Sequence, residues 1–470
     1  MAKRPYQDSP PQNDGLSAGR PAAVILGGEA NALSVSRSLA RLGARVYALN
    51  EPGSCARHSR ACRWISLPAG EGVEDAWARF LLGPESDYLK GAVVLACSDA
   101  GVQVLARHRE ALLARYLLDD SDVPAQLDML DKLATYRHAV AAGVATPKFW
   151  VAESREQLLD IRDELVYPLI VKPRLAHRAG KHFNSKHKFA TSFDQVLAAC
   201  AAERAAAVDV LLMEWVPGGD ERLCSYYTYL DEGGEHLFQF TKRVIRRYPA
   251  GMGPGTYHIT DWMPQLVAPA RAMFKQVGLR GLANIEFKLD PRDGRYKIIE
   301  CNARFTAANC LVASSGFDLA AFVYRRIAGL PQPALTTHKV GLRLLDPVVD
   351  SLSFLELRKL GQISLTQWAR SLMHRQTFPY FRWSDPMPAI VRTRKMLKSL
   401  LSGTKPVVAA PKLDAAGTAS GPGSASLRDA AKRMPVELGV APTVAALPAQ
   451  VIPEASPAPR GSPVTVSSNP

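Results

Sequence analysis

Apolar positions near the start of the chain recur with two different periods, which predict alternating strands and helices. Apolar runs of strand length cover residues 22–26, 44–49 and 93–97, and stretches of helical spacing cover residues 31–42 and 101–116. Gly27-Gly28 directly follows the first run and predicts a turn into the first helix. Because strand, helix and strand in succession are typical of a parallel sheet, residues 21–120 are predicted to form a small doubly wound α/β domain.

After residue 120 the pattern changes to strands joined by short turns. A helix is predicted from Asp131-Lys132 to Gly143, where the apolar spacing stops. Strands are predicted over residues 148–152, 167–173, 210–215, 223–229, 236–240, 282–289 and 295–302. Turn residues join the last of these strands in pairs, as in antiparallel hairpins. The fold class is therefore α/β followed by α+β, with the second domain over residues 121–335.

The last predicted hairpin carries the clearest chemistry. Glu286 and Glu300 lie on its two strands, and Glu300, Asn302 and Arg304 share one strand face because side chains alternate. Two carboxylates and an amide oxygen suit Mg²⁺, and a guanidinium can neutralise a phosphoryl group. The alternative is an exposed charged hairpin, but the apolar neighbours of Glu300 place it at the edge of a core, where polar groups need partners.

A second source of positive charge precedes this hairpin. Lys172 ends a predicted strand with an apolar run, Leu169-Ile170-Val171, leading into it, which favours a cation held against phosphate over a surface lysine. The stretch from Arg174 to Lys188 is basic and contains Gly180. It is either a flap over phosphates or a solvated loop, and both interpretations stay open.

The segment Glu214-Trp215-Val216-Pro-Gly-Gly-Asp220-Glu221 follows another predicted strand. A linker of this kind between two lobes can offer backbone N–H and C=O groups to an adenine edge. A carboxylate beside it can accept ribose hydroxyls. The segment therefore predicts a nucleotide site. Gly27-Gly28 is a weaker candidate, because its surroundings lack the GxGxxG spacing of a dinucleotide site.

Charge is concentrated in a C-terminal extension over residues 336–401. The chain has a formal net charge of +14. Residues 339–401 contain 11 Lys and Arg against 4 Asp and Glu, which gives +7. A short basic helix is predicted over residues 389–401; it either packs on the rest of the protein or makes a peripheral contact with an anionic membrane. No nucleic-acid partner is expected, since no nucleic-acid-binding motif accompanies this charge.

Composition limits the compartment and the ends of the chain. Residues 1–20 and 402–470 are polar or rich in Pro, Ala and Ser, and both are predicted to be disordered. The seven cysteines form no CxxC pair, which argues against a zinc site and a disulfide framework. No signal peptide and no apolar run of about 20 residues is recognised, so a cytoplasmic protein, peripheral to a membrane at most, is expected. Homo-oligomers are compatible with this composition.

In order and spacing, these motifs resemble those of the ATP-grasp superfamily over residues 21–330, and most closely the carboxylate–amine ligase branch that includes D-aspartate ligase. Carbamoyl-phosphate synthetase and D-alanine–D-alanine ligase are more distant relatives. The motifs that carry the resemblance are Lys132, Lys172, Glu214 to Glu221, Glu286, Glu300, Asn302 and Arg304. The resemblance implies a pre-ATP-grasp domain over residues 21–120, followed by a two-lobed ATP-grasp fold over residues 121–335.

The resemblance also implies roles. Phosphates would be held by Lys132 and Lys172, adenine by Glu214, Trp215 and Val216, ribose by Glu221 or Asp220, and Mg²⁺ or Mn²⁺ by Glu286, Glu300 and Asn302. Arg304, with Lys172, would act on the transferring phosphoryl group. ATP would activate a carboxylate as an acyl phosphate for attack by an amine. Bicarbonate activation and a non-catalytic nucleotide-binding scaffold are the alternatives.

The carboxylate substrate has its own candidates. Lys242 and Arg243 lie in a basic strand just before a Gly-rich segment, and arginine forks suit carboxylates. A solvated basic strand is the alternative, which for Arg243 carries equal weight and for Arg247 is favoured.

Overall fold

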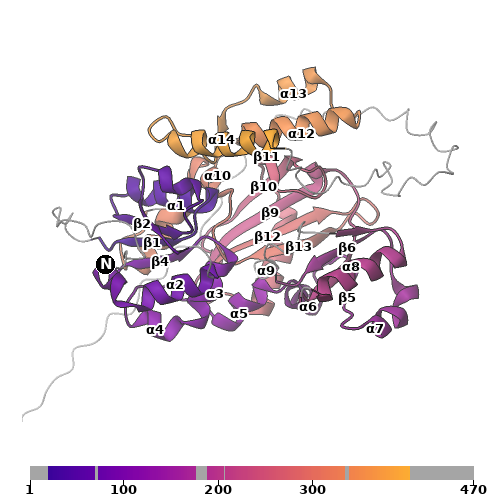
Figure 1. Cartoon of the computed structure of the whole chain (residues 1–470), viewed down its shortest axis with the longest axis horizontal. Coiled ribbons are helices and arrows are strands. Elements are labelled where there is room, and N and C mark those ends of the chain that lie inside the picture. Colours follow the sequence, from indigo (N-terminus) through magenta and orange to yellow (C-terminus); the bar gives the residue numbers. More distant parts are fainter. Residues whose placement is uncertain (1–19, 69–71, 176–187, 206, 334–337, 403–470) are drawn as a thin grey trace, which may run out of the picture. The chain divides into compact units, whose positions relative to one another are not determined.

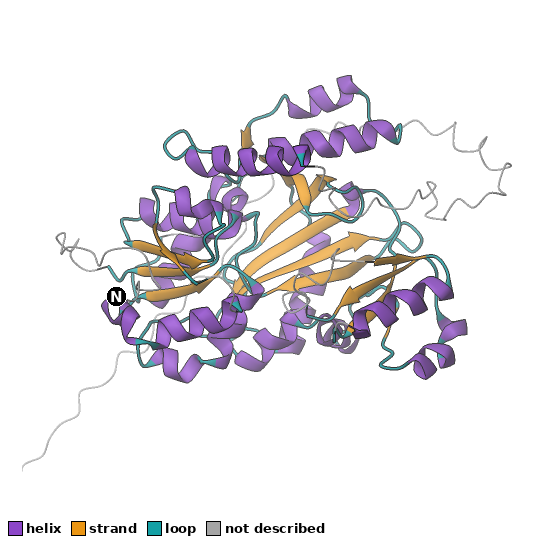
Figure 2. Ribbon diagram, viewed as in Figure 1, coloured by secondary structure: helices purple, strands orange, loops and turns teal. Residues whose placement is uncertain are grey.

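Three β-sheets with helices packed on them make up the part of the chain that can be described (Figures 1 and 2). The computed structural model describes residues 20–68, 72–175, 188–205, 207–333 and 338–402. All of these residues belong to one structural unit. The predicted mixed α/β fold class is confirmed. The two ends predicted to be disordered fall almost entirely outside the described residues.

The first sheet is parallel and has the strand order β3-β2-β1-β4. Its strands are β1 (Ala23–Leu26), β2 (Val46–Asn50), β3 (Arg63–Ser66) and β4 (Val93–Ala96), and its helices are α1 (Ala30–Arg41), α2 (Val73–Leu82), α3 (Asp99–Arg107) and α4 (Arg109–Leu113). Ala23 and Ile25 of β1 join the apolar cluster of α1, whereas Val24 and Leu26 join that of α2. Helices therefore cover both faces, which explains why β1 is a continuous apolar run.

The second sheet is small, with the order β5-β8-β6-β7 and antiparallel pairing. Its elements are β5 (Phe149–Trp150), β6 (Leu169–Pro173), β7 (Lys188–Ala190), β8 (Val210–Glu214), α7 (Arg155–Asp160) and α8 (Phe193–Ala205). Helices α5 (Val123–Leu130) and α6 (Lys132–Ala141) precede it. Asp131 begins α6, because its side chain accepts a hydrogen bond of 2.8 Å from the backbone N–H of Leu133.

The third sheet has seven strands in the order β13-β12-β9-β10-β11-β14-β15. Its strands are β9 (Leu223–Leu230), β10 (Phe240–Arg247), β11 (Gly255–Thr260), β12 (Gly281–Leu289), β13 (Tyr296–Asn302), β14 (Arg343–Leu345) and β15 (Gln376–Thr377). Helices α9 (Val267–Val277), α10 (Asn309–Ser314) and α11 (Leu319–Ile327) connect or flank these strands. β10 begins only at Phe240, so the strand expected over residues 236–240 is reduced to an isolated bridge between His236 and Leu230.

The C-terminal extension contributes to this sheet. β14 pairs with β11, and β15 pairs with β14. The expected boundary between residues 335 and 336 thus falls between strands of one sheet. The rest of the extension is helical: α12 (Pro347–Lys359), α13 (Leu365–Leu372) and α14 (Met387–Leu401) lie together along one side of the molecule, at the top of Figure 1.

Candidate active site

The hairpin of β12 and β13 brings two carboxylates together as predicted. Glu286 lies directly opposite Glu300 in the antiparallel register, so both side chains lie on one face of the large sheet. Asn302 lies opposite Asn284 on that face, and its Nδ2 donates to Asn284 Oδ1 at 3.3 Å. The turn is held by the buried Asp290 and ends at Gly294, whose φ of 69° favours glycine.

Burial dominates the electrostatics of Glu286. Burial, and then the neighbouring charge of Glu300, raises the pKa of Glu286, and the charge of Lys242 opposes this shift. No group of three or more His, Cys, Asp and Glu side chains within the described ranges could hold a metal ion. Any cation here would therefore be held by two carboxylates, an amide and the oxygens of a ligand.

Two lysines from outside the large sheet approach the same place. Lys172 of β6 is only 4% exposed, and its Nζ lies 3.4 Å from Met213 Sδ. Burial, and then the charge of Lys132, lowers the pKa of Lys172 to about 7, whereas the charge of Glu300 raises it. Lys132 lies at the start of α6 and is also buried. The two ammonium groups thus lie close to each other in a poorly solvated place.

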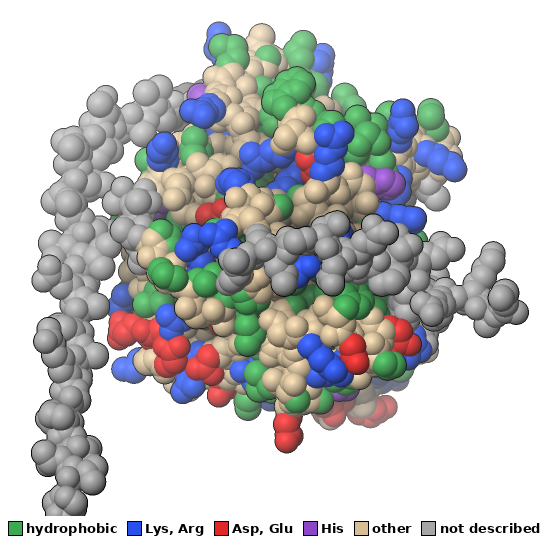
Figure 3. All heavy atoms as spheres, turned by 90° about the vertical axis from the view of Figure 1, so that its left-hand side faces the viewer, with side chains coloured by type: hydrophobic (Ala, Val, Ile, Leu, Met, Phe, Trp, Pro, Cys, Tyr) green, Lys and Arg blue, Asp and Glu red, His purple; other side chains and the backbone are tan. Residues whose placement is uncertain are grey.

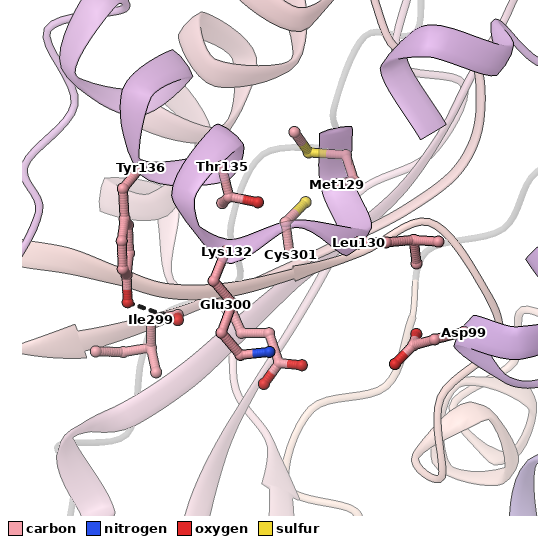
Figure 4. Close-up of a pocket in the computed structure, with 9 residues that line it drawn as sticks. All are labelled: Asp99, Met129, Leu130, Lys132, Thr135, Tyr136, Ile299, Glu300 and Cys301. Atoms are coloured by element: carbon pink, nitrogen blue, oxygen red, sulfur yellow. Dashed lines mark hydrogen bonds between the residues drawn. The ribbon is translucent and has the colours of Figure 1, made fainter. Parts of the chain in front are cut away.

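Lys132 and Glu300 line a small hollow together with Asp99, Thr135, Tyr136 and Ile299. In Figure 4 the Lys132 ammonium group and the Glu300 carboxylate point toward one another, and Asp99 lies across the hollow on α3. Arg304 Nε donates to Asp99 Oδ1, and its Nη1 donates to the carbonyl of Phe305 at 3.3 Å. The guanidinium of Arg304 is therefore held between the first domain and the large sheet.

The linker after β8 is held in place at its first residue, Glu214. Glu214 is 5% exposed, and its carboxylate contacts Arg292 Nη1 at 2.6 Å and accepts from the backbone N–H of Lys148 at 3.0 Å. Lys288 Nζ donates to the carbonyl of Val216 at 2.8 Å and lies 4.8 Å from the ring centroid of Trp215. The side chain of Glu214 is thus committed to protein groups, which fixes the linker backbone.

The two acids at the end of the linker differ in their contacts. Asp220 accepts from the backbone N–H groups of Arg247 at 3.1 Å and Gly251 at 3.0 Å. Burial raises the pKa of Asp220. The side chain of Glu221 is exposed. Asp220 therefore anchors the segment after β10, and Glu221 is the acid that a ligand could reach.

The two predicted substrate residues lie on opposite faces of β10. Lys242 is 2% exposed and lies in one row with Ser225 and Glu286, and its Nζ donates to Ser225 Oγ at 3.0 Å. Arg243, the next residue, points to the other face, where Nε donates to Asp261 at 2.7 Å. The structure brings Lys242 to the two carboxylates but does not bring Arg243 there.

Similarity to known proteins agrees with this geometry. Residues 259–332 match a family described as "Carbamoyl-phosphate synthase L chain, ATP binding domain". A D-aspartate ligase of Enterococcus faecium (strain Aus0004) is 23% identical over 251 residues, which cover 51% of this chain and 59% of the ligase.

Solved structures extend the likeness to the fold. An N5-carboxyaminoimidazole ribonucleotide synthetase in complex with ADP superposes with a TM-score of 0.53 at 17% identity, over 69% of this chain and 81% of the synthetase. An L-amino acid ligase from Bacillus licheniformis gives 0.50 at 18% identity, over 66% and 74% of the two chains. This chain has the ATP-grasp fold.

Several residues of this candidate site were not predicted from the sequence. Lys288 and Asn284 alternate with Glu286 along β12, so strand periodicity was a signal that could have found them. Asp99 carried no such signal, because it comes from the first domain. For Arg247 the sequence favoured a solvated position over a role in substrate binding. In the structure, burial and then the charge of Arg247 lower the pKa of Lys288 to about 8.

The expected flap lies outside the described residues except at its two ends. Arg174 contacts Asp131 at 2.6 Å, and Lys188 forms an ion pair with the buried Glu203. Arg174 thereby ties the end of β6 to the start of α6, so the strand that carries Lys172 is fixed to the helix that carries Lys132. No helix among the described residues is long and apolar enough to cross a membrane.

Proposed function

We propose that this protein is an ADP-forming ligase that uses ATP to activate a carboxylate as an acyl phosphate and joins it to an amine. The observation that carries the proposal is the convergence of Glu286 and Glu300 with the buried lysines Lys132 and Lys172, which come from different elements. Such a place is costly for the ligand-free protein and well suited to a triphosphate with a divalent cation.

Each part of the nucleotide has a proposed partner. Lys132 and Lys172 hold the phosphates as point charges. The linker backbone at Glu214 and Val216, with the Trp215 ring beside it, receives adenine, and Glu221 rather than the committed Asp220 takes the ribose. Lys288 holds the carbonyl of Val216 and so positions the linker.

Mg²⁺, with Mn²⁺ as the alternative, fits the residues present. Glu286, Glu300 and the amide oxygen of Asn302 would hold it, because Asn302 Nδ2 is the atom turned toward Asn284. Burial raises the pKa of Glu286, and a bound cation would favour the ionised carboxylate. When bound, the ion would neutralise negative charge on the phosphate oxygens.

The chemistry itself needs positioning more than a protein nucleophile. A carboxylate oxygen of the substrate attacks the γ-phosphorus, the bond to the bridging oxygen breaks, and ADP leaves. The amine nitrogen then attacks the acyl carbon, phosphate leaves, and the nitrogen loses a proton. Arg304 would stabilise the acyl phosphate, and Lys242 would attract the carboxylate to Glu286's side of the sheet. Because ATP is made inside the cell, the reaction is proposed to be cytoplasmic.

The test is a hydroxamate assay with product analysis. The protein is incubated with ATP, MgCl₂, hydroxylamine and a panel of carboxylates that begins with D- and L-aspartate, in view of the similarity to a D-aspartate ligase. We expect ADP, phosphate and a hydroxamate with one class of carboxylate, and no hydroxamate without a carboxylate. AMP as product would refute phosphoryl transfer. ADP release that depends on bicarbonate alone would indicate bicarbonate activation, and ATP binding without turnover would indicate a scaffold.

A further inference from the structure

The C-terminal helices expose an unusual set of side chains away from the proposed active site. Within the described ranges, most of the large apolar side chains that are exposed belong to residues 355–401. They are Leu355, Leu360, Leu365, Met373, Trp383, Met387, Ile390, Leu397, Leu400 and Leu401. Trp383 is 90% exposed and Leu401 is 88% exposed. Such a concentration of exposed apolar side chains is typical of an interaction surface.

On α14 most of the exposed apolar side chains form one stripe. Met387, Ile390, Leu397 and Leu401 recur at helical spacing and are all exposed. The opposite side of the helix faces the protein, where Pro388 is buried and Arg392 pairs with Asp346 at 2.7 Å. This helix therefore turns an apolar side outward, whereas a helix that only packs on a core buries that side.

The acidic residues of the extension are all engaged with the protein. Asp350 pairs with Arg246 at 2.8 Å, and Asp385 pairs with Arg37 at 3.0 Å. Asp346 pairs with Arg392, and Glu356 accepts from the backbone N–H of Ala250 at 2.9 Å. Residues 338–402 contain no other Asp or Glu. No carboxylate is therefore left to neutralise the outer surface of these helices.

Cations take the outer positions instead. The exposed basic residues of the extension include Arg358, Lys359, Arg370, Arg375, Arg394 and Lys398. Arg394 and Lys398 lie within the apolar stripe of α14, one helical turn apart. Figure 3, which keeps the vertical direction of Figure 1, shows hydrophobic and basic side chains together at the top of the molecule, whereas most acidic side chains lie lower down.

We propose that the outer surface of α12, α13 and α14, with Trp383, docks on an anionic lipid membrane. The apolar side chains would enter the boundary between head groups and acyl chains, and the cations would pair with lipid phosphates. Tryptophan is favoured at that boundary because its ring is apolar and carries one N–H donor. Nucleic acid would also attract the cations, but a phosphate backbone gives no reason to expose Leu, Ile and Met on the same stripe.

The experiment is flotation of the full chain with vesicles of phosphatidylcholine alone and with phosphatidylglycerol added. We expect binding to the anionic vesicles that weakens with salt and little binding to the neutral ones. Arg394→Glu with Lys398→Glu should lower binding at least about tenfold, since each cation near a charged surface contributes roughly 1 kcal/mol. Leu397→Ser with Leu401→Ser should weaken binding at low and at high salt, because the burial of apolar side chains in the membrane does not depend on charge.

Matched controls lie on other helices. Arg155→Glu with Lys275→Glu, and Leu113→Ser with Leu159→Ser, change exposed side chains of α7, α9 and α4. These variants should bind as the unchanged protein does, and all variants should keep their melting temperature and ATP turnover.

Three results would overturn the proposal. The first is equal binding to neutral and anionic vesicles, or none to either. The second is competition by DNA or RNA that the Leu397→Ser, Leu401→Ser variant leaves unchanged, which would indicate a nucleic-acid surface. The third is a dimer that this variant dissociates, because the stripe would then bind a second copy of the chain. Vesicle binding that appears only after residues 403–470 are deleted would count in the same way, because the stripe would then bind those residues.

Discussion

Two buried cations lie four residues apart on β10, and their surroundings are opposite. Arg246 donates to both carboxylate oxygens of Asp350 at 2.8 Å and to Ser371 Oγ at 2.8 Å. Lys242 is just as buried, but its Nζ contacts the hydroxyl of Ser225 and, at 3.4 Å, Nδ1 of His258. Burial lowers the pKa of Lys242. Arg246 has a carboxylate in direct contact, whereas the nearest opposite charge that acts on Lys242 is that of Glu286 along the same row.

Two acids near the end of β12, Glu286 and Asp290, differ in the same way. Burial alone would raise the pKa of Asp290, but hydrogen bonds from Arg292 and Lys297 lower it. For Glu286 the pKa is raised, because burial and Glu300 outweigh the charge of Lys242. Burial by itself therefore does not distinguish a structural charge from a functional one. What distinguishes them is whether the fold itself supplies the opposite charge.

The largest expected effect concerns the compensated pair. Asp350→Ala would leave Arg246 buried without its carboxylate, and we expect a loss of about 3–5 kcal/mol in the free energy of unfolding. Urea denaturation measures it. The control is Asp261→Ala, which removes the partly exposed partner of Arg243 and should cost less than about 1 kcal/mol. Equal losses in the two variants would contradict the distinction drawn between these ion pairs.

Glu300→Gln tests the candidate metal site. It removes a charged ligand but keeps the shape, so Mg²⁺-dependent ATP turnover should fall by about 100-fold or more, which corresponds to roughly 2.7 kcal/mol. The melting temperature without ligands should change little, because the loss of a like charge beside Glu286 is offset by the loss of an opposite charge beside Lys132 and Lys172. Glu110→Gln, on the exposed side of α4, should change neither quantity. Near-normal turnover in Glu300→Gln would remove the basis for the metal assignment.

Alternation of side chains along a strand was enough to predict the central part of the candidate site. It gave the β12–β13 hairpin and the shared face of Glu286 and Glu300, because their register is regular up to that point. The apolar run before Lys172 correctly predicted a buried strand end. The ATP-grasp resemblance is confirmed, whereas the role of each residue stays a prediction.

Predictions from the sequence were least accurate where the strands are irregular. The register of β10 against β11 shifts between Val244 and Arg246 and again before Arg247. A shift of this kind changes the face to which a side chain points, and alternation counted along the sequence cannot follow it. This explains why Arg246 contacts Asp350 of α12, although strict alternation would place it on the same face as Lys242. The ion pair of Arg304 with Asp99 joins two domains and has no local pattern at all.

The smallest predicted effect is a proton taken up when ATP binds. Without ligand, burial and the neighbouring Lys132 lower the pKa of Lys172 to about 7, so at pH 8 its side chain is mostly neutral. Phosphates beside it would raise this pKa toward its usual value, so nearly one proton should enter with ATP. Because a complex that gains a proton is weakened as pH rises, ATP affinity should fall by about tenfold per pH unit between pH 7.5 and 9.

Titration calorimetry at pH 8 in two buffers with different ionisation enthalpies measures this uptake. Lys172→Arg should reduce it, since a guanidinium stays charged at every pH used, and the pH dependence of ATP affinity should flatten. Lys275→Arg on α9 is the matched control, because Lys275 is exposed and should not change the uptake. If Lys172→Arg takes up as many protons as the unchanged protein, then Lys172 does not contact the phosphates. Lys172 would then be a structural charge, as Arg246 is, and not a group that binds a ligand.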